Sequence, residues 1–503
     1  MNISKSKYTR FCQCPKILWL DIYKREKAVL DLAVERRFEE GNNVGDYAMR
    51  YFEENFSQAE VKNADGSLNI PVMLAKTKVL IKQDVETICE AAFQTDGCFC
   101  AVDILHKENG GYAIYEVKSS TKLSDVYIQD ISFQKYVLEK AGILVTGTYI
   151  LHVNNKYMRN GKIDIHQLFV CEDVSSRVAE HLPLVPSLIN EAKKVCSLKD
   201  EPERKLGEYC RAPYECAYWK YCSEEVHSIP SPSVFDLYHI SFKNALALYD
   251  DGIVTFEDVV KENVDLTEKQ QVQILGNDLF EKEYVSAFLS RLSRPLYFLD
   301  FETFQTCIPE YDGVKPYQQI PFQYSLHFFD GVPDITLKAL RHKEFLFCGA
   351  GDPRRELAES LIKDIPDNAC IIAYNKGFEC GRIKELADAF PDLKDALMFR
   401  REHFYDLLDV FKNGYVYKKS MGGSFSIKSV LPALFPNDPE KDYHNLEDVH
   451  NGQEAASSFL ELRDKSTEEK ERLRRNLLKY CEKDTMAMVW IWQWLVKKVN
   501  GKI

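Results

Sequence analysis

The stretch YFLDFETF, residues 297–304, places two acids inside an apolar and aromatic run. Side chains alternate between the two faces of a β-strand, so Asp300 and Glu302 leave one face and their apolar neighbours leave the other. Two carboxylates on a buried strand repel each other and lose hydration unless a cation lies between them. The stretch therefore predicts a buried strand that carries a metal site.

A further carboxylate is expected from the segment IIAYNKGFECGRIKELA, residues 371–387. It reads as a strand running into a helix, with Asn375 and Glu379 at the junction. Asp406, in FYDLLDVF, is the reserve candidate for the same role. A glutamate near an asparagine is frequent on ordinary helices, so this segment alone does not establish a site.

The segment YCEKDTMAM, residues 480–488, supplies the last acid. It lies late in a predicted helix that begins with a capping box, Ser466 to Glu469. Tyr480 and Asp484 are four residues apart and therefore share one helical face.

Taken in order, Asp300 and Glu302, then Asn375 and Glu379, then Tyr480 and Asp484 resemble the motifs of DEDD 3'-to-5' exonucleases of the ribonuclease H-like fold. The resemblance implies that Asp300, Glu302 and Asp484 bind two divalent cations about 4 Å apart. It also implies that Tyr480 orients the attacking water. The family usually has Asp where this chain has Glu379, which is one methylene longer.

A second set of polar residues lies in FCAVDILHKENGGYAIYEVKSS, residues 99–120, which predicts a hairpin turning at Asn109. Glu116 and Lys118 are two apart and share a face, and Asp103 of the preceding strand can come alongside them. Two carboxylates hold a hard divalent cation, and a lysine can orient water or stabilise negative charge. A solvated strand face with alternating charges is the alternative.

The hairpin and the helix after it resemble the PD-(D/E)xK nuclease fold of the RecB family, with an Asp ending one strand and Glu-x-Lys on the next. In DISFQKYVLEKAG, Gln134 matches the family's glutamine on the helix after the motif. The family's acid or histidine on the first helix would fall on Glu39 or Glu40 of RRFEEGNNVGDYAM, unless these form a solvated helix end.

Four of the fifteen cysteines form a third pattern. GEYCRAPYECAYWKYC holds Cys210, Cys216 and Cys222 at equal spacing, and three thiolates need a fourth partner for a closed four-cysteine site. No CxxC pair is present, which disfavours a zinc ribbon. An early cysteine followed by three late ones resembles iron-sulfur nucleases of the RecB type. In that family the early ligand lies in a segment like CPKxLWL, so the resemblance implies that Cys14 of FCQCPKILWL, rather than Cys12, joins the three late cysteines in holding a 4Fe-4S cluster.

The alternative is that Cys210, Cys216 and Cys222 are buried or unpaired cysteines that bind no metal. If a cluster is present, it closes a very long loop and acts as a staple. The cysteines that stand alone in the sequence are expected to be small buried hydrophobes: Cys89, Cys171, Cys196, Cys307, Cys348, Cys370 and Cys481.

The whole chain is expected to be α/β, with three parts at residues 1–225, 233–290 and 295–503. These are a PD-(D/E)xK nuclease fold with an iron-sulfur staple, a helical connector and a ribonuclease H-like domain with a mixed sheet. The connector, around SFKNALALYDDGIVTFEDVV, suggests a helix-hairpin-helix unit or two packed helices. Strands are expected at residues 297–304, 321–329, 335–345 and 370–375.

Composition favours a soluble protein, with 45% hydrophobic and 28% charged residues and a net charge of -12. No apolar run approaches the roughly 20 residues of a membrane span, and the N-terminus has no apolar signal region, so a cytoplasmic location is expected. The acidic charge does not exclude nucleic acid, because a nuclease needs only a local basic groove. GGSFSIKS, residues 422–429, lacks the second glycine of a phosphate-binding loop, so opening a duplex would require a partner helicase.

This combination resembles a bacterial family that fuses a RecB-type iron-sulfur nuclease to an exonuclease of the YprB type. The resemblance implies a metal-dependent nuclease that uses Mg or Mn and acts on DNA rather than RNA, although the exonuclease half alone is equally consistent with RNA. Two alternatives remain. One nuclease module is inactive and clamps nucleic acid, or the protein is an iron-sulfur regulatory protein without nuclease activity.

Overall fold

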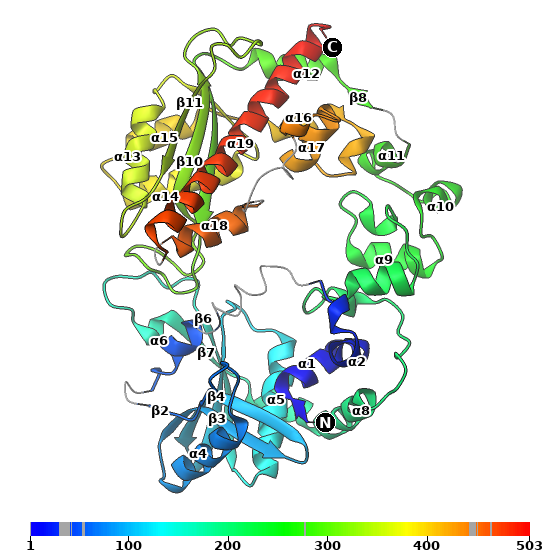
Figure 1. The fold of residues 1–503 in the computed structure, drawn as a ribbon, viewed down its shortest axis with the longest axis vertical. Coiled ribbons are helices and arrows are strands. Elements are labelled where there is room, and N and C mark those ends of the chain that lie inside the picture. Colours follow the sequence, from blue (N-terminus) through cyan, green and yellow to red (C-terminus); the bar gives the residue numbers. More distant parts are fainter. Residues whose placement is uncertain are drawn as a thin grey trace. The chain divides into compact units, whose positions relative to one another are not determined.

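A computed structural model of the chain describes residues 2–29, 41, 43–52, 56–275, 278–441, 449, 451–462 and 465–502 (Figure 1). The fold is mixed α/β, as expected. Contacts divide the chain into an N-terminal unit, Met1–Pro230 with Thr306–Tyr317, and a C-terminal unit, Ser231–Gln305 with Gln318–Ile503. Residues 233–290 therefore belong to the same unit as the second sheet. The expected three-part division stays a prediction.

The described residues of the N-terminal unit form a seven-stranded sheet in the order β2-β3-β4-β5-β6-β7, with β1 paired to β4. Pairing is antiparallel in β3–β4–β5 and β6–β7 and parallel in β5–β6, β1–β4 and β2–β3. The strands are β1 (Ile3–Ser4), β2 (Ser57–Gln58), β3 (Thr87–Thr95), β4 (Cys98–Glu108), β5 (Gly111–Lys118), β6 (Val145–Val153) and β7 (Phe169–Asp173).

The hairpin predicted around Asn109 is confirmed. β4 and β5 pair in antiparallel register, with Ile104 opposite Tyr115 and Glu108 opposite Gly111. The two turn residues between them, Asn109 and Gly110, have φ angles of 50° and 79°. This left-handed turn is open to Asn and Gly at little steric cost, so the NGG signal sets the hairpin locally.

Helices cover the sheet of the N-terminal unit, and α5 connects the parallel strands β5 and β6. A strand–helix–strand crossover lays its helix on the face of the sheet. The helices are α1 (Lys5–Gln13), α2 (Pro15–Tyr23), α4 (Ile70–Lys82), α5 (Asp125–Lys140), α6 (Ile165–Leu168), α7 (Ser175–His181) and α8 (Val185–Cys196). Glu208–Cys210 is a 3₁₀ turn and Tyr221–Val226 is a π-helical turn.

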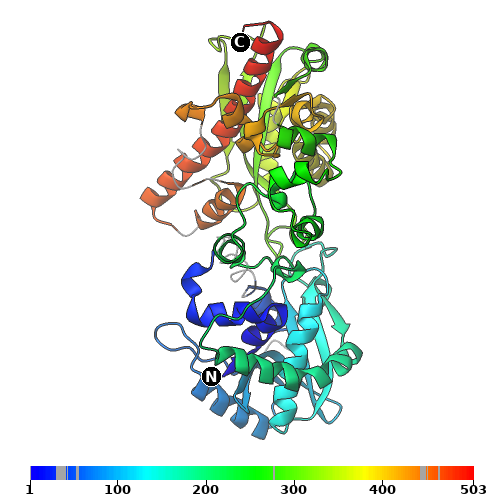
Figure 2. The ribbon, with the colours of Figure 1, turned by 90° about the vertical axis from the view of Figure 1, so that its right-hand side faces the viewer.

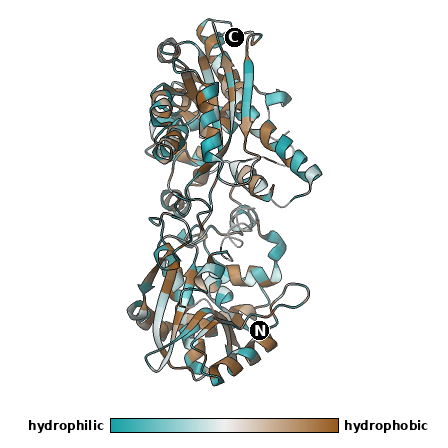
Figure 3. Cartoon of the chain, turned by 90° about the vertical axis from the view of Figure 1, so that its left-hand side faces the viewer, coloured by the Kyte–Doolittle hydropathy of each residue, from teal (hydrophilic) through white to brown (hydrophobic). Residues whose placement is uncertain are grey.

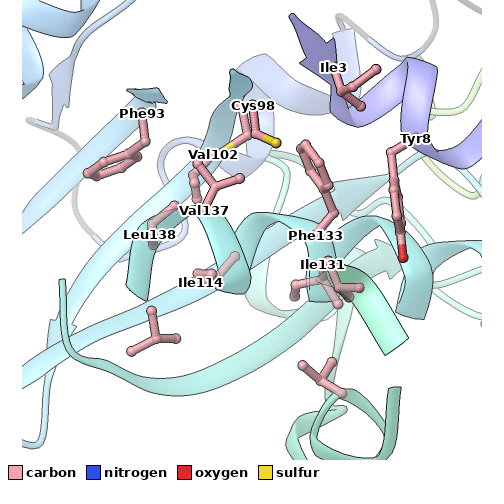
Figure 4. Packing of buried hydrophobic residues seen from close by; sticks show 14 of the residues in the cluster. Ile3, Tyr8, Phe93, Cys98, Val102, Ile114, Ile131, Phe133, Val137 and Leu138 are labelled. Carbon is pink, nitrogen blue, oxygen red and sulfur yellow. The ribbon is translucent and has the colours of Figure 1, made fainter. Parts of the chain in front are cut away.

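The core of this unit lies between α1, α5 and the sheet (Figure 4). Tyr8 of α1 stacks on Phe133 of α5, with ring centroids 4.9 Å apart. Phe133 is fully buried, and truncation of such a side chain to Ala costs about 3–5 kcal/mol. The same packing fixes the rotation of α1 and α5, so that the polar residues on these two helices face the sheet.

The loop that follows β9 is part of the N-terminal unit. Arg159 Nη1 donates to the carbonyl oxygens of Pro309 at 3.1 Å and Glu310 at 2.6 Å. Tyr317 donates its hydroxyl hydrogen to the carbonyl of Ser119, one residue beyond β5. The chain therefore enters and leaves the C-terminal unit more than once.

In the C-terminal unit, the described residues form a five-stranded mixed sheet in the order β11-β10-β9-β12-β13. β10 is antiparallel to β9 and β11, whereas β12 is parallel to β9 and β13. These strands are β9 (Leu296–Phe304), β10 (Ile320–Phe329), β11 (Arg341–Leu346), β12 (Cys370–Ala373) and β13 (Phe404–Asp406), and β8 (Leu279–Phe280) pairs separately with β14 (Val416–Tyr417).

Apolar side chains on the two faces of β9 enter two different cores. Leu299 and Phe301 pack with α13, α14 and α15, whereas Leu296 and Phe298 pack with α17 and α19. Figure 1 shows α13–α15 on one side of the sheet, and Figure 2 shows the long α19 crossing the other. The helices are α12 (Lys282–Ser290), α13 (Arg354–Asp364), α14 (Gly377–Ala389), α15 (Lys394–Arg401), α16 (Leu408–Lys412), α17 (Ile427–Leu434), α18 (Gly452–Glu461) and α19 (Thr467–Val499).

Helix α19 begins where its sequence signal places it. The Ser466 side chain accepts a hydrogen bond from the backbone N–H of Glu469, and the Glu469 side chain accepts one from the backbone N–H of Ser466. These two bonds confirm the predicted capping box. Hydrophobic and hydrophilic residues alternate along this helix and the others (Figure 3). The amphipathic pattern buries one face of α19 against β9 and β10.

The connector contains α9 (Phe242–Asp250), α10 (Phe256–Lys261) and α11 (Glu268–Leu275). The expected helix, Gly-containing turn and helix are present, with Gly252 at φ 82°. Thr255 and Asp258 form a capping box that starts α10.

Three expectations from the sequence are wrong in detail. Cys171 and Cys348 are exposed, because Cys171 points outward from the edge strand β7 and Cys348 follows β11 in a loop. The strand expected at 335–345 begins only at Arg341, because Asp334 accepts a hydrogen bond from the backbone N–H of Thr336 and forms a turn.

A membrane-spanning helix must be both long and apolar, and none of the helices in the described part of the chain meets both conditions.

Candidate functional site

Strand β9 presents Asp300 and Glu302 to the face of the sheet covered by α19. Asp300 is partly buried and Glu302 is 6% exposed. In the ladder with β10, Asp300 lies opposite Ser325 and Glu302 opposite Gln323. The predicted alternation of acids and apolar residues is therefore confirmed, and the two carboxylates lie on one face of a central strand.

Helix α19 brings Tyr480, Cys481 and Asp484 to the same place. Cys481 Sγ lies 3.8 Å from Asp300 Oδ2, and ligand atoms of Asp300, Glu302 and Cys481 lie within 4.8 Å of one another. Tyr480 is 4% exposed, and burial together with Asp484 and Glu302 raises the pKa of its phenol far above the usual 10. The side chain therefore remains a neutral O–H donor at all physiological pH values.

The carboxylates of this site repel one another strongly in the absence of a cation. Burial, then Asp484, then Glu302 raise the pKa of Asp300 well above 3.8. Burial and Asp484 likewise raise the pKa of Glu302 well above 4.5, although Lys428 opposes the shift. Carboxylates whose charged forms are this unfavourable accept a proton or a cation.

Glu379 joins the cluster from the first turn of α14. It is 2% exposed, and its Oε2 atom has no hydrogen-bond partner among the described residues. Burial raises the pKa of Glu379 to about 8. Its charge contributes to the raised pKa of both Asp300 and Glu302, whereas the charged groups that act on the pKa of Glu379 itself are Asp406 and Arg382.

Asp406, the reserve candidate, has a different task. Its Oδ1 accepts from the backbone N–H groups of Asn375 at 2.9 Å and Leu408 at 3.0 Å, and its Oδ2 accepts from that of Lys376 at 3.1 Å. These bonds hold the turn between β12 and α14, where Asn375 has a φ of 71°. Asp406 therefore orients the start of the helix that carries Glu379.

Two groups around Glu302 were not expected to belong to the site. Lys428 of α17 lies close enough to lower the pKa of Glu302, and its Nζ is 5.5 Å from the centre of the Tyr480 ring. A Cβ atom added to Gly452, the first residue of α18, would lie 3.6 Å from Glu302 Oε2. A helix N-terminus beside a carboxylate stabilises its negative charge.

The donor set of this site fits a hard divalent cation. Its carboxylates, one of which has a buried oxygen without a hydrogen-bond partner among the described residues, are the oxygen ligands that Mg²⁺ and Mn²⁺ prefer, and the sulfur of Cys481 lies beside them. A bound cation would remove the repulsion that raises the carboxylate pKa values. Asp300, Glu302 and Asp484 are the residues that would hold it, with Glu379 as a fourth carboxylate.

The structure also brings together Asp103, Glu116, Lys118 and Gln134 in the N-terminal unit. Lys118 Nζ donates to Glu116 Oε1 at 2.6 Å, and Gln134 Nε2 donates to Glu116 Oε2 at 2.6 Å. Asp103 Oδ2 accepts from the backbone N–H of Val117 at 2.8 Å. Glu116 is 1% exposed, so these contacts replace water around a buried charge.

Lys5 of α1 lies between the two carboxylates. Its Nζ donates to Glu116 Oε1 at 2.9 Å and lies 3.4 Å from Asp103 Oδ1. Burial lowers the pKa of Lys5, but Asp103 and Glu116 outweigh that effect and raise it well above 10.5. Lys5 is thus a charged ammonium in the position where a shared cation would lie.

Asp130 and Glu90 complete the charge balance of this site. Asp130 of α5 accepts from Lys118 at 2.8 Å and from Gln134 at 3.1 Å. Glu90 interrupts the ladder between β3 and β4 at φ 54°, and burial and Asp103 raise its pKa to about 8. Every carboxylate oxygen of Asp103 and Glu116 accepts a hydrogen bond, so the present arrangement does not fit a metal unless Lys5 moves.

The four predicted cluster cysteines line one pocket together with Lys16, Arg204 and Tyr209: Cys14, Cys210, Cys216 and Cys222. Among the described residues, no three of these sulfurs lie within 4.8 Å of one another. One tetrahedral zinc, with Zn–S bonds of about 2.3 Å, would need sulfurs about 4 Å apart. Lys16 and Arg204 place positive charge beside the four thiols.

Polar bonds tie the early and late segments around this pocket. Gln13 Nε2 donates to the carbonyl oxygens of Tyr209 at 2.9 Å and Tyr214 at 2.8 Å. Tyr218 donates to Asp21 Oδ1 at 2.9 Å. These bonds join the segment around residue 14 to the segment that carries the three late cysteines.

The residues missed from the sequence had unequal signals. Asp130 is four residues before Gln134, a spacing that places both on one helical face. Lys428 lies in GGSFSIKS, residues 422–429, whose pattern is informative only about a phosphate-binding loop. Lys5 had no local signal, because it reaches Glu116 only through the pairing of β1 with β4. Glu39 and Glu40 lie outside the described residues.

Comparison with known proteins adds two matches. The family described as "Domain of unknown function (DUF2779)" matches residues 297–426, which contain Asp300, Glu302 and Glu379. An uncharacterised protein, UU173, from Ureaplasma parvum serovar 3 is 28% identical over 238 residues, which are 43% of this chain and 33% of that protein. The chain thus matches about a third of the length of this relative, and neither match states an activity.

Proposed function

We propose that this chain is a metal-dependent nuclease whose C-terminal unit hydrolyses phosphodiester bonds as a 3'-to-5' exonuclease. The observation that carries the proposal is the convergence of Asp300, Glu302, Glu379 and Asp484 from three separate elements. Carboxylates gathered in this way repel one another, and bound cations or protons relieve that repulsion. Two divalent cations, Mg²⁺ or Mn²⁺, would supply charge neutralisation and a nucleophilic water.

Residues around the carboxylates suit the remaining tasks. Tyr480 keeps its proton, so it can donate a hydrogen bond and orient a water molecule. Lys428 supplies a cation beside Glu302 and Tyr480, where it can contact a phosphate. The mixed sheet with the acids on its central strand is the arrangement that the ribonuclease H-like resemblance implies.

Cleavage of end-labelled strands tests this function. Single-stranded DNA and RNA labelled at either end are incubated with Mg²⁺, Mn²⁺ or chelator, and the label shows the direction of digestion. Asp300→Asn is expected to lower the rate by at least about 100-fold, since losing even an outer partner of a metal ligand costs about 10- to 100-fold. Asp395→Asn, in the first turn of α15, is the matched control.

The result that sinks the proposal is cleavage by Asp300→Asn at the control rate, or metal-independent cleavage by all proteins. Faster digestion of RNA than DNA would leave the site assignment intact and change the substrate. We propose DNA because the N-terminal unit resembles RecB-type enzymes, which act on DNA. Duplex substrates should require a partner helicase or a frayed end.

A second candidate function follows from Lys5: the N-terminal unit clamps nucleic acid without cutting it. Its carboxylate oxygens are already bonded by Lys5, Lys118 and Gln134. In a cutting enzyme of the PD-(D/E)xK type, Asp103 and Glu116 would instead hold a divalent cation, with Lys118 beside it. The N-terminal unit is a second nuclease if a metal ion displaces Lys5, and a clamp if Lys5 stays in place.

Manganese binding decides between a clamp and a second nuclease. In an Asp300→Asn background, we expect Lys5→Ala to bind Mn²⁺ at the N-terminal site at least about tenfold more tightly than the parent, measured by electron paramagnetic resonance. Lys7→Ala is the control, because Lys7 Nζ donates only to the carbonyl of Asn2. Tight binding with Lys5 in place would refute the clamp and support a second nuclease site.

We further propose a 4Fe-4S cluster on Cys14, Cys210, Cys216 and Cys222. The cluster would brace the N-terminal unit, as the RecB-type iron-sulfur resemblance implies. Iron and sulfide analysis of protein purified without oxygen tests it, and a protein that carries the cluster but never cleaves DNA or RNA would instead be a regulatory iron-sulfur protein.

A further inference from the structure

A second group of metal-binding side chains lies in the C-terminal unit on strands other than β9. His327 of β10, His342 of β11 and Glu482 of α19 place ligand atoms within 4.8 Å of one another. The two histidines are direct partners across the antiparallel ladder, and their ring centroids are 4.6 Å apart. The two histidines and the glutamate come from three different elements, so only the folded chain brings these three side chains together.

Hydrogen bonds around the two rings leave one nitrogen of each histidine with its lone pair available. Thr485 donates its hydroxyl hydrogen to the carbonyl of Glu482 at 3.1 Å. A hydroxyl has one hydrogen, so Thr485 Oγ1 accepts from His327 Nδ1 at 2.8 Å and from Ser325 Oγ at 2.7 Å. Ser325 Oγ, having donated, accepts from His342 Nε2 at 3.0 Å.

This proton assignment leaves His327 Nε2 and His342 Nδ1 as the unprotonated ring nitrogens. A metal-ligating histidine typically donates its other N–H to an oxygen, which fixes the ring and its tautomer. His327 is 5% exposed, and burial lowers its pKa to about 3. The neutral ring is the form that binds metal, and His342 is exposed enough to admit an ion.

We propose that His327, His342 and Glu482 bind a zinc ion that fastens α19 to β10 and β11. Two imidazoles and one carboxylate select zinc or a similar late transition metal over Mg²⁺, which prefers oxygen ligands. This donor set therefore differs in kind from the carboxylate set around Asp300.

Zinc at this position would also steady the nuclease site. Glu482 lies two residues before Asp484 on α19, so a bond from Glu482 to the metal fixes the turn that carries Asp484. The site is independent of the proposed nuclease activity, because zinc binding is measured without any substrate.

Equilibrium titration of the metal-stripped full chain tests the proposal, with Zn²⁺ competed against a chromophoric chelator. The wild type should bind one more equivalent of Zn²⁺ than His342→Ala and Glu482→Gln. The affinity lost should exceed the about 10- to 100-fold that removal of an outer partner costs. His403→Ala is the control, since His403 bonds to the carbonyl of Phe399 at the end of α15.

Zinc bound elsewhere, on the cysteines or on the acids around Asp300, is common to all these proteins and cancels in the difference. Glu482→Gln preserves shape, so its melting temperature without metal should equal that of the wild type even if His342→Ala unfolds. Asp300→Asn should abolish cleavage while keeping the zinc equivalent, which separates the two assignments. Equal zinc stoichiometry in the wild type and Glu482→Gln would overturn the site.

Discussion

Replacement of Glu379 by glutamine should stabilise the metal-free protein. Glu379 is 2% exposed, its Oε2 atom has no hydrogen-bond partner among the described residues, and its charge acts on Asp300 and Glu302. The amide is neutral at every pH, so folding neither protonates a carboxylate nor buries its charge, and the amide adds two donors that can pair with carboxylates. A substitution inside the candidate site would therefore raise stability where most core substitutions lower it.

The magnitude follows from the pKa of Glu379, which burial raises from 4.5 to about 8. One pKa unit corresponds to about 1.36 kcal/mol, so this group lowers stability by about 3 kcal/mol at pH 7, where folding must protonate it, and by about 5 kcal/mol above pH 8, where folding buries its charge. Below pH 4.5 the carboxyl is protonated in both states and the cost is absent. Wild-type stability should thus fall as pH rises from 4.5 to 8, and the gain from Glu379→Gln should grow over the same range.

Urea unfolding in chelator at pH 5, 7 and 8.5 measures this gain. Glu356→Gln is the matched control, because Glu356 occupies the first turn of α13 but is exposed. Added Mn²⁺ should then stabilise the wild type more than Glu379→Gln, because a ligand that binds only the folded state adds its binding free energy. A gain that is absent, or equal at pH 5 and 8.5, would refute the view that Glu379 is a strained carboxylate.

Three further results are expected. Tyr480→Phe should lower the cleavage rate about 10- to 1,000-fold while leaving Mn²⁺ affinity unchanged, because it removes a hydrogen-bond donor but no metal ligand. Lys428→Met should weaken binding of single-stranded DNA in a filter assay and reduce its salt dependence by about one phosphate contact. The Cys14→Ser protein should lose its iron when purified without oxygen. The Cys12→Ser protein should keep its iron, because Cys12 does not line the pocket that holds the four cysteines.

Local periodicity was enough to predict the elements that carry the candidate sites. The alternation in YFLDFETF predicted β9 and its two faces, the Asn109 turn predicted the β4–β5 hairpin, and Ser466 marked the start of α19. These features depend on residues close in sequence. The strand after β10 was predicted too early because Asp334 forms a turn that competes with extended backbone.

Long-range contacts could not be predicted in the same way. Lys5 reaches Glu116, 111 residues away, only because β1 pairs with β4. His327 and His342 read as ordinary strand residues until the register places them opposite each other. Asp406 was the reserve candidate beside Glu379, and only the folded chain shows that its oxygens bond to the backbone before α14. In each case the deciding partner comes from another element of the fold.

The central claim is that the acids of β9, α14 and α19 hold divalent cations. The most direct measurement is anomalous scattering from a crystal of the full chain soaked in Mn²⁺. Two Mn²⁺ ions about 4 Å apart should appear, each within about 2.2 Å of carboxylate oxygens from Asp300, Glu302 or Asp484. No Mn²⁺ density at these carboxylates, in a crystal where Mn²⁺ is bound elsewhere, would contradict the claim.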